Sequence, residues 1–376
     1  MAFNDTKNYT VATITYLHSD NFGSVLQTYA LNKVLINMGY NAYVIDYKKE
    51  VVDNLYKIFK PNNSFYNFAT NIYSLLNYKK LNDRKIAYSR FRKEYIKKSN
   101  VQYHTYSELK EKHPKADCYI CGSDQIWNLD IVDFDDSYLL SFVEKGKKIS
   151  YAASGICDST SDSNIKKIVE HTNSFDYISV RENIAKEKLE KLSNSSISVV
   201  LDPVFLLNRK SWEDIAGDSD YIKEPYMLCY FAGGVSNDFE KYTYNLSKKL
   251  KLKRVIIMPE WRNIFRIGKK YYNSGPVEFL TLFKYASFVC TNSFHGTSFS
   301  ILFNKPFIVG LHKPYTEDRI NTLLSFCNLS DQEIDPANDP IKDAILNIDF
   351  NFANKKIEMA RSKCRQWLKN AIEGEV

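Results

Sequence analysis

Short apolar runs alternate with helical patterns along most of the chain, as in parallel α/β proteins. Residues 10–17 are rich in β-forming side chains and predict a first strand. Apolar residues then recur at helical spacing from Leu26 to Met38, and Gly39 follows at the usual place of a left-handed helix cap. Residues 43–46 predict a second strand. A strand, a helix and a strand in this order form a βαβ unit, which predicts a parallel sheet.

The same alternation continues and then restarts after a polar segment at about residues 218–225. We therefore predict an N-terminal Rossmann-like domain over 1–217, with an insertion at about 48–115 where the pattern weakens. A C-terminal Rossmann-like domain is expected over 218–348. The last segment, 349–376, predicts a helix that packs back onto a domain, with the first domain as one candidate.

The stretch 288–307 combines a buried strand with a polar turn and a helix. An apolar run ends at Cys290, and apolar residues resume at helical spacing from Phe299 until Pro306 ends the helix. His295 is therefore expected at the helix N-terminus, where the helix dipole favours an anionic ligand. The same field disfavours imidazolium and leaves a neutral imidazole able to accept a proton. The alternative, a turn histidine that caps its own helix, stays open.

Two other strand ends carry polar side chains suited to a ligand. The turn 21–24 follows the first strand, but it lacks the G-x-G-x-x-G pattern, which argues against a dinucleotide. Asp124 follows a predicted central strand, between a glycine and Trp127. A carboxylate in this place has the character of a substrate site, and an Asx-turn cap explains it equally well.

Arg181 lies where a strand over 177–180 stops and a helix starts. Its guanidinium fork is able to hold a carboxylate or a phosphate. The alternative is that Arg181 pairs with Glu182 or Asp202 and has no catalytic role.

Composition narrows the class of protein. The 376 residues predict two domains, and the contents of 44% hydrophobic and 25% charged residues are those of a soluble globular protein. The net charge of +7 is mild, and without a long Lys/Arg run it favours a small anionic substrate over nucleic acid. The 27 tyrosines fit either sugar-stacking surfaces or Tyr-rich cores.

Seven scattered cysteines predict reduced thiols and a cytoplasmic location. Cys118 and Cys121 have the spacing of half a zinc site, but two packed strand cysteines are favoured because no second pair stands at ligand spacing. No His/Cys/carboxylate cluster predicts a metal. We expect neither a signal peptide, since polar residues occupy the region that its apolar core would need, nor a membrane span, since no apolar run reaches the required length.

Several short motifs, taken together and in order, resemble the polysaccharide pyruvyl transferase family over roughly residues 10 to 330. They are Asn21-Phe22-Gly23 with Leu26-Gln27-Thr28-Tyr29-Ala30-Leu31, Cys121-Gly122-Ser123-Asp124-Gln125-Ile126-Trp127-Asn128, Ser179-Val180-Arg181-Glu182, Asp202-Pro203 and Asn292-Ser293-Phe294-His295-Gly296-Thr297. The resemblance implies an α/β fold of two Rossmann-like domains facing across a cleft, similar to GT-B glycosyltransferases. It also implies transfer of pyruvate from phosphoenolpyruvate onto two hydroxyls of a sugar, which gives a cyclic ketal and free phosphate.

Asp124, Arg181 and His295 match the active-site positions of that family. Many members place an arginine two residues before this histidine, where the present chain has Ser293. The residues expected to bind the donor are Arg181, Ser293, Phe294, Gly296, Thr297, Lys305 and Arg319. Those expected to bind the acceptor are Asn21, Phe22, Gly23, Gln125 and Trp127.

The resulting hypothesis is a phosphoenolpyruvate-dependent transferase of surface or capsular polysaccharide biosynthesis. Phosphoenolpyruvate is a co-substrate, no cofactor is expected, and the acceptor is a sugar or a lipid-linked oligosaccharide. Nucleic acid is not an expected partner, and membrane contact is expected only through the acceptor. Two alternatives stay open: a GT-B glycosyltransferase that uses a nucleotide sugar, and a non-catalytic glycan-binding relative.

Overall fold

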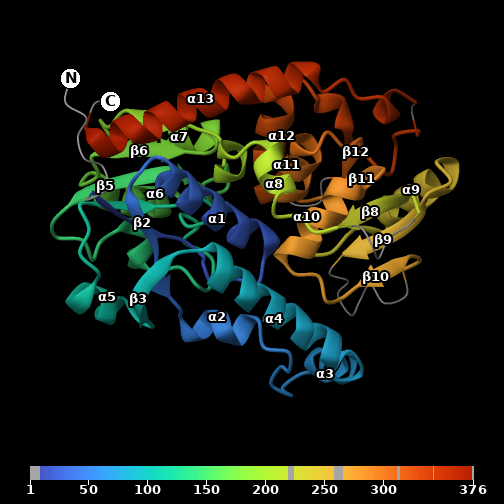
Figure 1. Ribbon diagram of the computed structural model, residues 1–376, viewed down its shortest axis with the longest axis horizontal. Helices are drawn as coiled ribbons and strands as arrows, with labels where there is room; N and C mark the ends of the chain where they lie inside the picture. The colour runs from blue at the N-terminus through green and yellow to red at the C-terminus, as the bar shows by residue number, and fades with distance from the viewer. Residues whose placement is uncertain (1–8, 219–223, 258–265, 311–313, 342, 375–376) are drawn as a thin grey trace. The chain divides into compact units, whose positions relative to one another are not determined.

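The chain forms two compact α/β units, each built on one parallel sheet (Figure 1). The computed structural model describes residues 9–218, 224–257, 266–310, 314–341 and 343–374. Unit 1 comprises Met1–Tyr56, Arg92–Leu207 and Glu358–Val376, and unit 2 comprises Lys57–Phe91 and Asn208–Ile357. The predicted fold class of two Rossmann-like α/β domains is thereby confirmed.

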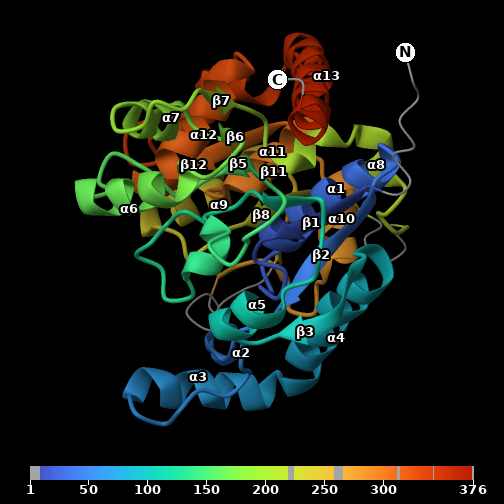
Figure 2. The ribbon, with the colours of Figure 1, turned by 90° about the vertical axis from the view of Figure 1, so that its left-hand side faces the viewer.

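Unit 1 contains a seven-stranded sheet in the order β3-β2-β1-β4-β5-β6-β7, and all neighbouring strands are parallel (Figure 2). The strands are β1 (Thr10–Ile14), β2 (Asn41–Tyr47), β3 (Lys98–Tyr103), β4 (Cys118–Cys121), β5 (Lys147–Ala153), β6 (Tyr177–Val180) and β7 (Ile197–Val199). The chain builds outward from β1 to β3, then returns to β4 and builds outward on the other side. The strand order therefore reverses between β1 and β4.

The helices of unit 1 connect these strands. They are α1 (Phe22–Asn37), α2 (Glu50–Leu55), α5 (Tyr106–Lys112), α6 (Asp162–Thr172) and α7 (Asn183–Glu190), with the 3₁₀ helices η2 (Asp136–Leu139) and η3 (Pro203–Leu206). Gly39 follows α1 with φ of 96°, a left-handed conformation that favours glycine, so the predicted helix end is confirmed.

Unit 2 repeats this plan with six parallel strands in the order β10-β9-β8-β11-β12-β13. The strands are β8 (Tyr226–Tyr230), β9 (Lys253–Ile257), β10 (Lys269–Tyr271), β11 (Phe288–Thr291), β12 (Phe307–Gly310) and β13 (Glu333–Ile334). The remaining helices are α3 (Phe65–Leu76), α4 (Tyr78–Tyr95), α8 (Arg209–Glu213), α9 (Asn237–Lys249), α10 (Pro276–Tyr285), α11 (Phe294–Leu302), α12 (Pro314–Phe326), η5 (Ser330–Gln332), η6 (Asp343–Leu346) and α13 (Asn351–Glu373). Here the order reverses between β8 and β11.

The segment predicted as an insertion at about 48–115 is more closely tied to the fold than its sequence pattern indicates. It supplies β3, which pairs with β2 in the sheet of unit 1. Its portion Lys57–Phe91 groups with unit 2, whereas the sequence placed it within the N-terminal domain. The sequence hides this affiliation, because α3 turns its apolar side chains to solvent and α4 is highly charged, so neither has the pattern of a helix that packs on a core.

The greater part of α13 belongs to unit 1. Arg361 Nε donates to the carbonyl of Phe205 at 2.7 Å, and Arg365 Nε donates to that of Leu206 at 3.0 Å. The C-terminal helix thus satisfies carbonyl groups of η3. Among the described helices, none has both the length and the apolar character needed to cross a membrane.

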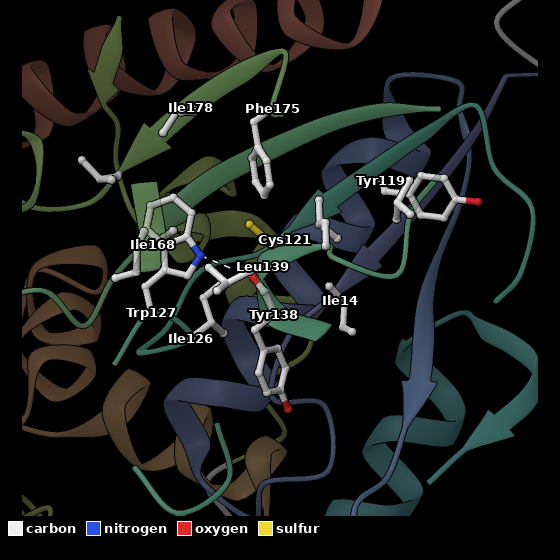
Figure 3. Close-up of a cluster of buried hydrophobic side chains, with 14 of the residues drawn as sticks. Ile14, Tyr119, Cys121, Ile126, Trp127, Tyr138, Leu139, Ile168, Phe175 and Ile178 are labelled. Atoms are coloured by element: carbon white, nitrogen blue, oxygen red, sulfur yellow. Dashed lines mark hydrogen bonds between the residues drawn. The ribbon is translucent and has the colours of Figure 1, made fainter. Parts of the chain in front are cut away.

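Each sheet is buried within an apolar core of its own. In unit 1 the core around β4 includes Cys121, Trp127 and Tyr138 (Figure 3). Cys118 and Cys121 are both fully buried in β4, and burial raises the pKa of each thiol. They are therefore packed strand cysteines, as the sequence favoured.

Candidate functional site

The motif loops lie at the two places where strand order reverses. In unit 1, Asn21 follows β1 and Asp124 follows the neighbouring strand β4. In unit 2, the turn 232–234 follows β8 and Asn292 follows the neighbouring strand β11. Ligands of open parallel sheets bind at the carboxyl ends of the strands at such points. Each unit therefore presents its own candidate site.

Asp124 is held against the N-terminus of α1. The Asn21 side chain caps α1 by accepting from the backbone N–H of Gly23 at 2.8 Å, and the Ser24 hydroxyl donates to Asp124 Oδ2. Asp124 has φ of 77°, a conformation that costs a non-glycine residue about 1–3 kcal/mol and persists only where the surroundings enforce it. One such constraint is the N–H of Ser154, which donates to the Asp124 carbonyl at 3.1 Å. The carboxylate is thus fixed at the carboxyl edge, and it is partly exposed.

Arg181 occupies the centre of a buried polar cluster. Its Nε donates to Glu182 Oε1 at 2.9 Å, its Nη1 to Asp202 Oδ2 at 2.6 Å and its Nη2 to Ser154 Oγ at 2.7 Å. Burial opposes the charged form, but Glu182, Asp202 and Asp124 outweigh it and raise the pKa of the guanidinium. The arginine is therefore a permanent cation between two carboxylates.

This cluster corrects the expected donor-binding role of Arg181. The residue is only 5% exposed, and its fork holds Glu182 and Asp202, so the alternative of structural pairing describes it better. Two carboxylates against one guanidinium also leave a net negative charge. A phosphate dianion would meet repulsion there.

The cluster does not form a metal site either. No group of three or more His, Cys, Asp or Glu side chains among the described residues is placed to hold a metal ion. The described part of the chain therefore offers carboxylates and hydroxyls for acid–base work at this edge, with arginine as their counter-ion.

His295 is the second residue of α11, on the strand-to-helix turn that the sequence predicted. It is 7% exposed, and its ring lies edge-to-face on Phe294 with 5.2 Å between centroids. Ser293 is the N-cap, and its hydroxyl accepts from the N–H of Gly296 at 3.4 Å. The serine that stands in the family's arginine position thus stabilises the helix start and brings no charge.

Asn292 fixes the loop next to His295. Its side-chain oxygen accepts from the N–H of Ala232 at 2.7 Å, and its amide donates to the carbonyl of Gly234 at 2.7 Å. These bonds connect the ends of β8 and β11. Gly233 and Gly234 have φ of 68° and 94°, so the turn is one that glycine adopts readily.

Gly296 allows α11 to start close to its strand. A Cβ at this position would overlap the Thr291 hydroxyl and lie 3.1 Å from Tyr230 Cδ1. We expect Gly296→Ala to lower the free energy of unfolding by about 1–3 kcal/mol, since overpacking a tight site forces neighbours to move. Denaturant unfolding measures this. Gly217→Ala is the control, because its Cβ would meet its nearest atom at 3.5 Å, and an equal loss in both variants would contradict the steric explanation.

The structure also removes three side chains from the expected ligand surface. Phe22 and Trp127 are 0% exposed, and the Trp127 indole donates to the Tyr138 carbonyl at 3.4 Å within the core (Figure 3). Lys305 follows the C-terminal end of α11, before β12 begins. Nine helical residues span about 13 Å, so Lys305 lies at the opposite end of the helix from His295. Neither the two aromatic acceptor positions nor this donor position fits its predicted role.

The other predicted residues keep positions compatible with a site. Asn21 is exposed, Gln125 and Arg319 are partly exposed, and Gly23, Phe294, Gly296 and Thr297 are buried in or near the starts of α1 and α11. The Thr297 hydroxyl donates to the Ser293 carbonyl, so its role is in the helix.

Sequence reasoning missed the contributions of Ser24 and Ser154. Ser24 lies in the first turn of α1, at the end of the predicted ligand turn 21–24, and Ser154 directly follows β5. Small polar residues at these two places were the available signal. It also missed the ion cluster around Asp46, in which His18 Nε2 lies 2.5 Å from Oδ1 and Lys98 Nζ lies 2.5 Å from Oδ2. The partners come from three separate segments, so no local pattern reveals them.

The comparison with known families completes this picture. The sequence model described as polysaccharide pyruvyl transferase matches residues 21–310 of the chain. The chain belongs to the polysaccharide pyruvyl transferase family. The match begins at the α1 cap and ends with β12, so this member of the family carries all the motif loops within the matched segment. No curated protein matches the chain.

Solved structures that are similar to this pyruvyl transferase family member have low sequence identity to it. The N-terminal domain of Candida albicans trehalose-6-phosphate phosphatase is 9% identical with a TM-score of 0.55, over 100% of this chain and 99% of that one. S. aureus MnaA with UDP is 13% identical with a TM-score of 0.49, over 97% and 90% of the two chains. The Methanocaldococcus jannaschii UDP-GlcNAc 2-epimerase with UDP-GlcNAc and UDP is 13% identical with a TM-score of 0.48, over 96% and 99%.

His18 makes the stability of this family member dependent on pH. Burial lowers the pKa of His18, and the positive charges of Arg92 and Lys98 lower it further. The hydrogen bond to Asp46 acts in the opposite direction, but it does not outweigh burial. Because an unfolded histidine titrates near pH 6.5, the unfolded chain binds more protons below about that pH, and the free energy of unfolding falls there. We expect His18→Gln to remove part of this fall. Denaturant unfolding on either side of about pH 6.5 tests it, and parallel profiles for the two proteins would contradict it.

Proposed function

We propose that the protein transfers pyruvate from phosphoenolpyruvate onto a sugar of a surface or capsular polysaccharide, or of its lipid-linked precursor. One observation carries the proposal. In a member of the pyruvyl transferase family, the motif loops with Asp124 and His295 follow strands at the reversal points of the two sheets. These are the places where parallel sheets bind ligands.

The reaction requires one addition to the enol phosphate, followed by one displacement of phosphate. The first sugar hydroxyl adds to the carbon that bears phosphate, and a proton passes to the methylene carbon, which becomes a methyl group. The second hydroxyl then attacks the same carbon, and phosphate leaves with the electrons of its C–O bond. The phosphate takes up the proton that this hydroxyl loses. The products are a cyclic ketal and inorganic phosphate.

We assign Asp124 to the acceptor hydroxyl, as the group that orients it and accepts its proton. The carboxylate is partly exposed and fixed by Ser24, which suits this role. We assign His295 to proton transfer on the donor, with the start of α11 favouring the anionic phosphate. Arg181 is a positioning residue, because it is buried and donates to the hydroxyl of Ser154, whose backbone N–H donates to the carbonyl of Asp124. That the two units act on one substrate pair is a prediction of the family resemblance.

Phosphate release tests the proposal. The protein is incubated with phosphoenolpyruvate and a panel of acceptors that contain galactose or N-acetylmannosamine. Acceptor-dependent phosphate release, with a ketal product in the mass spectrum, is expected. Release of a nucleoside diphosphate from a nucleotide sugar would replace the proposal by a glycosyltransferase, and sugar binding without donor consumption would replace it by a glycan-binding module.

A further inference from the structure

Helix α3 turns an apolar face to solvent. The exposed side chains are spaced at i, i+3, i+7, i+10 and i+11, which places them on one side of the helix. They are Phe65 (85% exposed), Phe68, Ile72, Leu75 and Leu76 (79% exposed). Folded proteins rarely leave an apolar stripe of this kind uncovered, and such patches mark interaction surfaces.

The opposite side of α3 is polar, and this is the side bonded to the protein. Ser74 is the only buried residue of the helix. Asn71 Nδ2 donates to the Lys60 carbonyl at 2.8 Å and its Oδ1 accepts from the Lys60 N–H at 2.7 Å, while Asn67 Nδ2 donates to the Pro61 carbonyl at 2.9 Å. A helix that packs on a core buries its apolar face. In α3 the polar face is bonded to the protein and the apolar face points to solvent.

Unit 2 holds the α3–α4 segment in place through several contacts. The rings of Tyr73 and Tyr272 lie 6.1 Å apart, and Lys80 Nζ lies 4.9 Å from the centroid of the Tyr272 ring. Gly275 approaches Ala87 of α4 so closely that a Cβ would clash there. The exposed face is therefore presented by a packed segment.

The same segment concentrates the positive charge of the protein. Residues 57–91 contain seven Lys or Arg and one Asp, so they contribute six of the formal net charge of +7. The sequence shows no long basic run because two of these residues precede α3 and the other five are spread along α4. Lys79 and Arg90 are exposed examples on α4.

We propose that residues 57–91 dock the protein on an anionic phospholipid surface. An interfacial helix lies in the membrane plane with its apolar face at the boundary between headgroups and acyl chains. Basic residues beside it bind the negative surface, and their attraction falls within a Debye length. The net positive charge argues for this occupant over a second copy of the chain, since two such segments repel each other. The proposal goes beyond the expected contact through the acceptor alone, and it does not rest on the transferase assignment.

Vesicle co-sedimentation of the full chain tests this. Wild-type protein is expected to bind vesicles of phosphatidylcholine and phosphatidylglycerol in equal parts at least about tenfold more strongly than phosphatidylcholine alone, and added salt should reduce this preference. Combining Phe65→Ser, Leu75→Ser and Leu76→Ser should weaken binding to the mixed vesicles by about tenfold or more. Lys79→Glu with Arg90→Glu should abolish the preference for the anionic lipid.

Matched controls alter exposed residues elsewhere. Val101→Ser with Val132→Ser controls for lost apolar surface, and Lys33→Glu with Lys110→Glu controls for reversed charge. Both are expected to bind like wild type. The proposal is overturned if the controls lose binding equally, if wild type ignores anionic lipid, or if wild type is a dimer that the triple serine variant dissociates. Phosphate release with a water-soluble acceptor is measured in parallel, and it should be unchanged in all variants, so that loss of docking and loss of catalysis are told apart.

Discussion

Replacing His295 by Ala is expected to lower the rate of pyruvyl transfer by about 10²- to 10⁴-fold, the usual contribution of one positioned acid–base group. The imidazole is the titratable side chain at the start of α11, next to a serine cap that has no charge to offer. The backbone around it is fixed by Asn292 and by the Ser293 cap. Loss of the ring should therefore remove a chemical group and leave its surroundings in place.

The measurement is kcat with saturating phosphoenolpyruvate and acceptor. Since His295 is buried, thermal unfolding must be measured on the same sample, and His295→Gln supplies a second variant of more similar volume. His104→Ala removes an exposed histidine and serves as the control. Near-wild-type turnover in both His295 variants would show that the proton is carried by another group.

Replacing Arg181 by Met is expected to lower the free energy of unfolding by about 3–5 kcal/mol, the usual result of removing one partner of a buried ion pair. The substitution leaves Glu182 and Asp202 buried without their shared counter-ion. Asp202→Asn should cost less, because Arg181 then keeps Glu182 as its partner. Arg181→Lys should lie between wild type and Arg181→Met, since lysine keeps the charge but cannot make three contacts with one planar fork.

This order of stabilities separates the structural role of Arg181 from donor binding. Denaturant unfolding measures the order of stabilities, which tests the structural role. The apparent KM for phosphoenolpyruvate tests the donor-binding role. A donor-binding arginine would raise that KM with little effect on stability. Such a result would reinstate the role that the sequence suggested, and Lys191→Met at the exposed C-terminal end of α7 is the control for loss of a cation.

The sequence predicted local structure well where a helix or strand signals itself through its own residues. The strand before His295, the turn and the start of the helix after it are as expected, because the apolar run and the apolar spacing of the helix act within a few residues of one another. The helix ends at Leu302, earlier than the predicted end at Pro306. Cys118 and Cys121 were likewise interpreted correctly from one strand. Prediction failed for β3, because all but one of its side chains are exposed or only partly buried and because its partner β2 lies far back in the chain.

Roles of side chains were harder to predict than their positions. Trp127 follows Asp124 by three residues, but in the folded turn the indole is buried in the core while the carboxylate bonds to Ser24 of α1. From the sequence, Arg181 was suited to bind a phosphate or to form an ion pair. The structure decides for the ion pair, because Asp202, from a distant loop, accepts from its Nη1. Burial and charge balance come from all neighbours at once, and a single motif contains only a few of them.

By itself, the sequence determined the two Rossmann-like units, the family and the turn that places His295 at a helix start, since each depends on short-range order along the chain. The tertiary structure decided which charges neutralise one another, which aromatic rings are buried and which face of α3 remains outside. These outcomes depend on contacts between residues far apart in the chain, and their free energies are set by the removal of water from whole clusters.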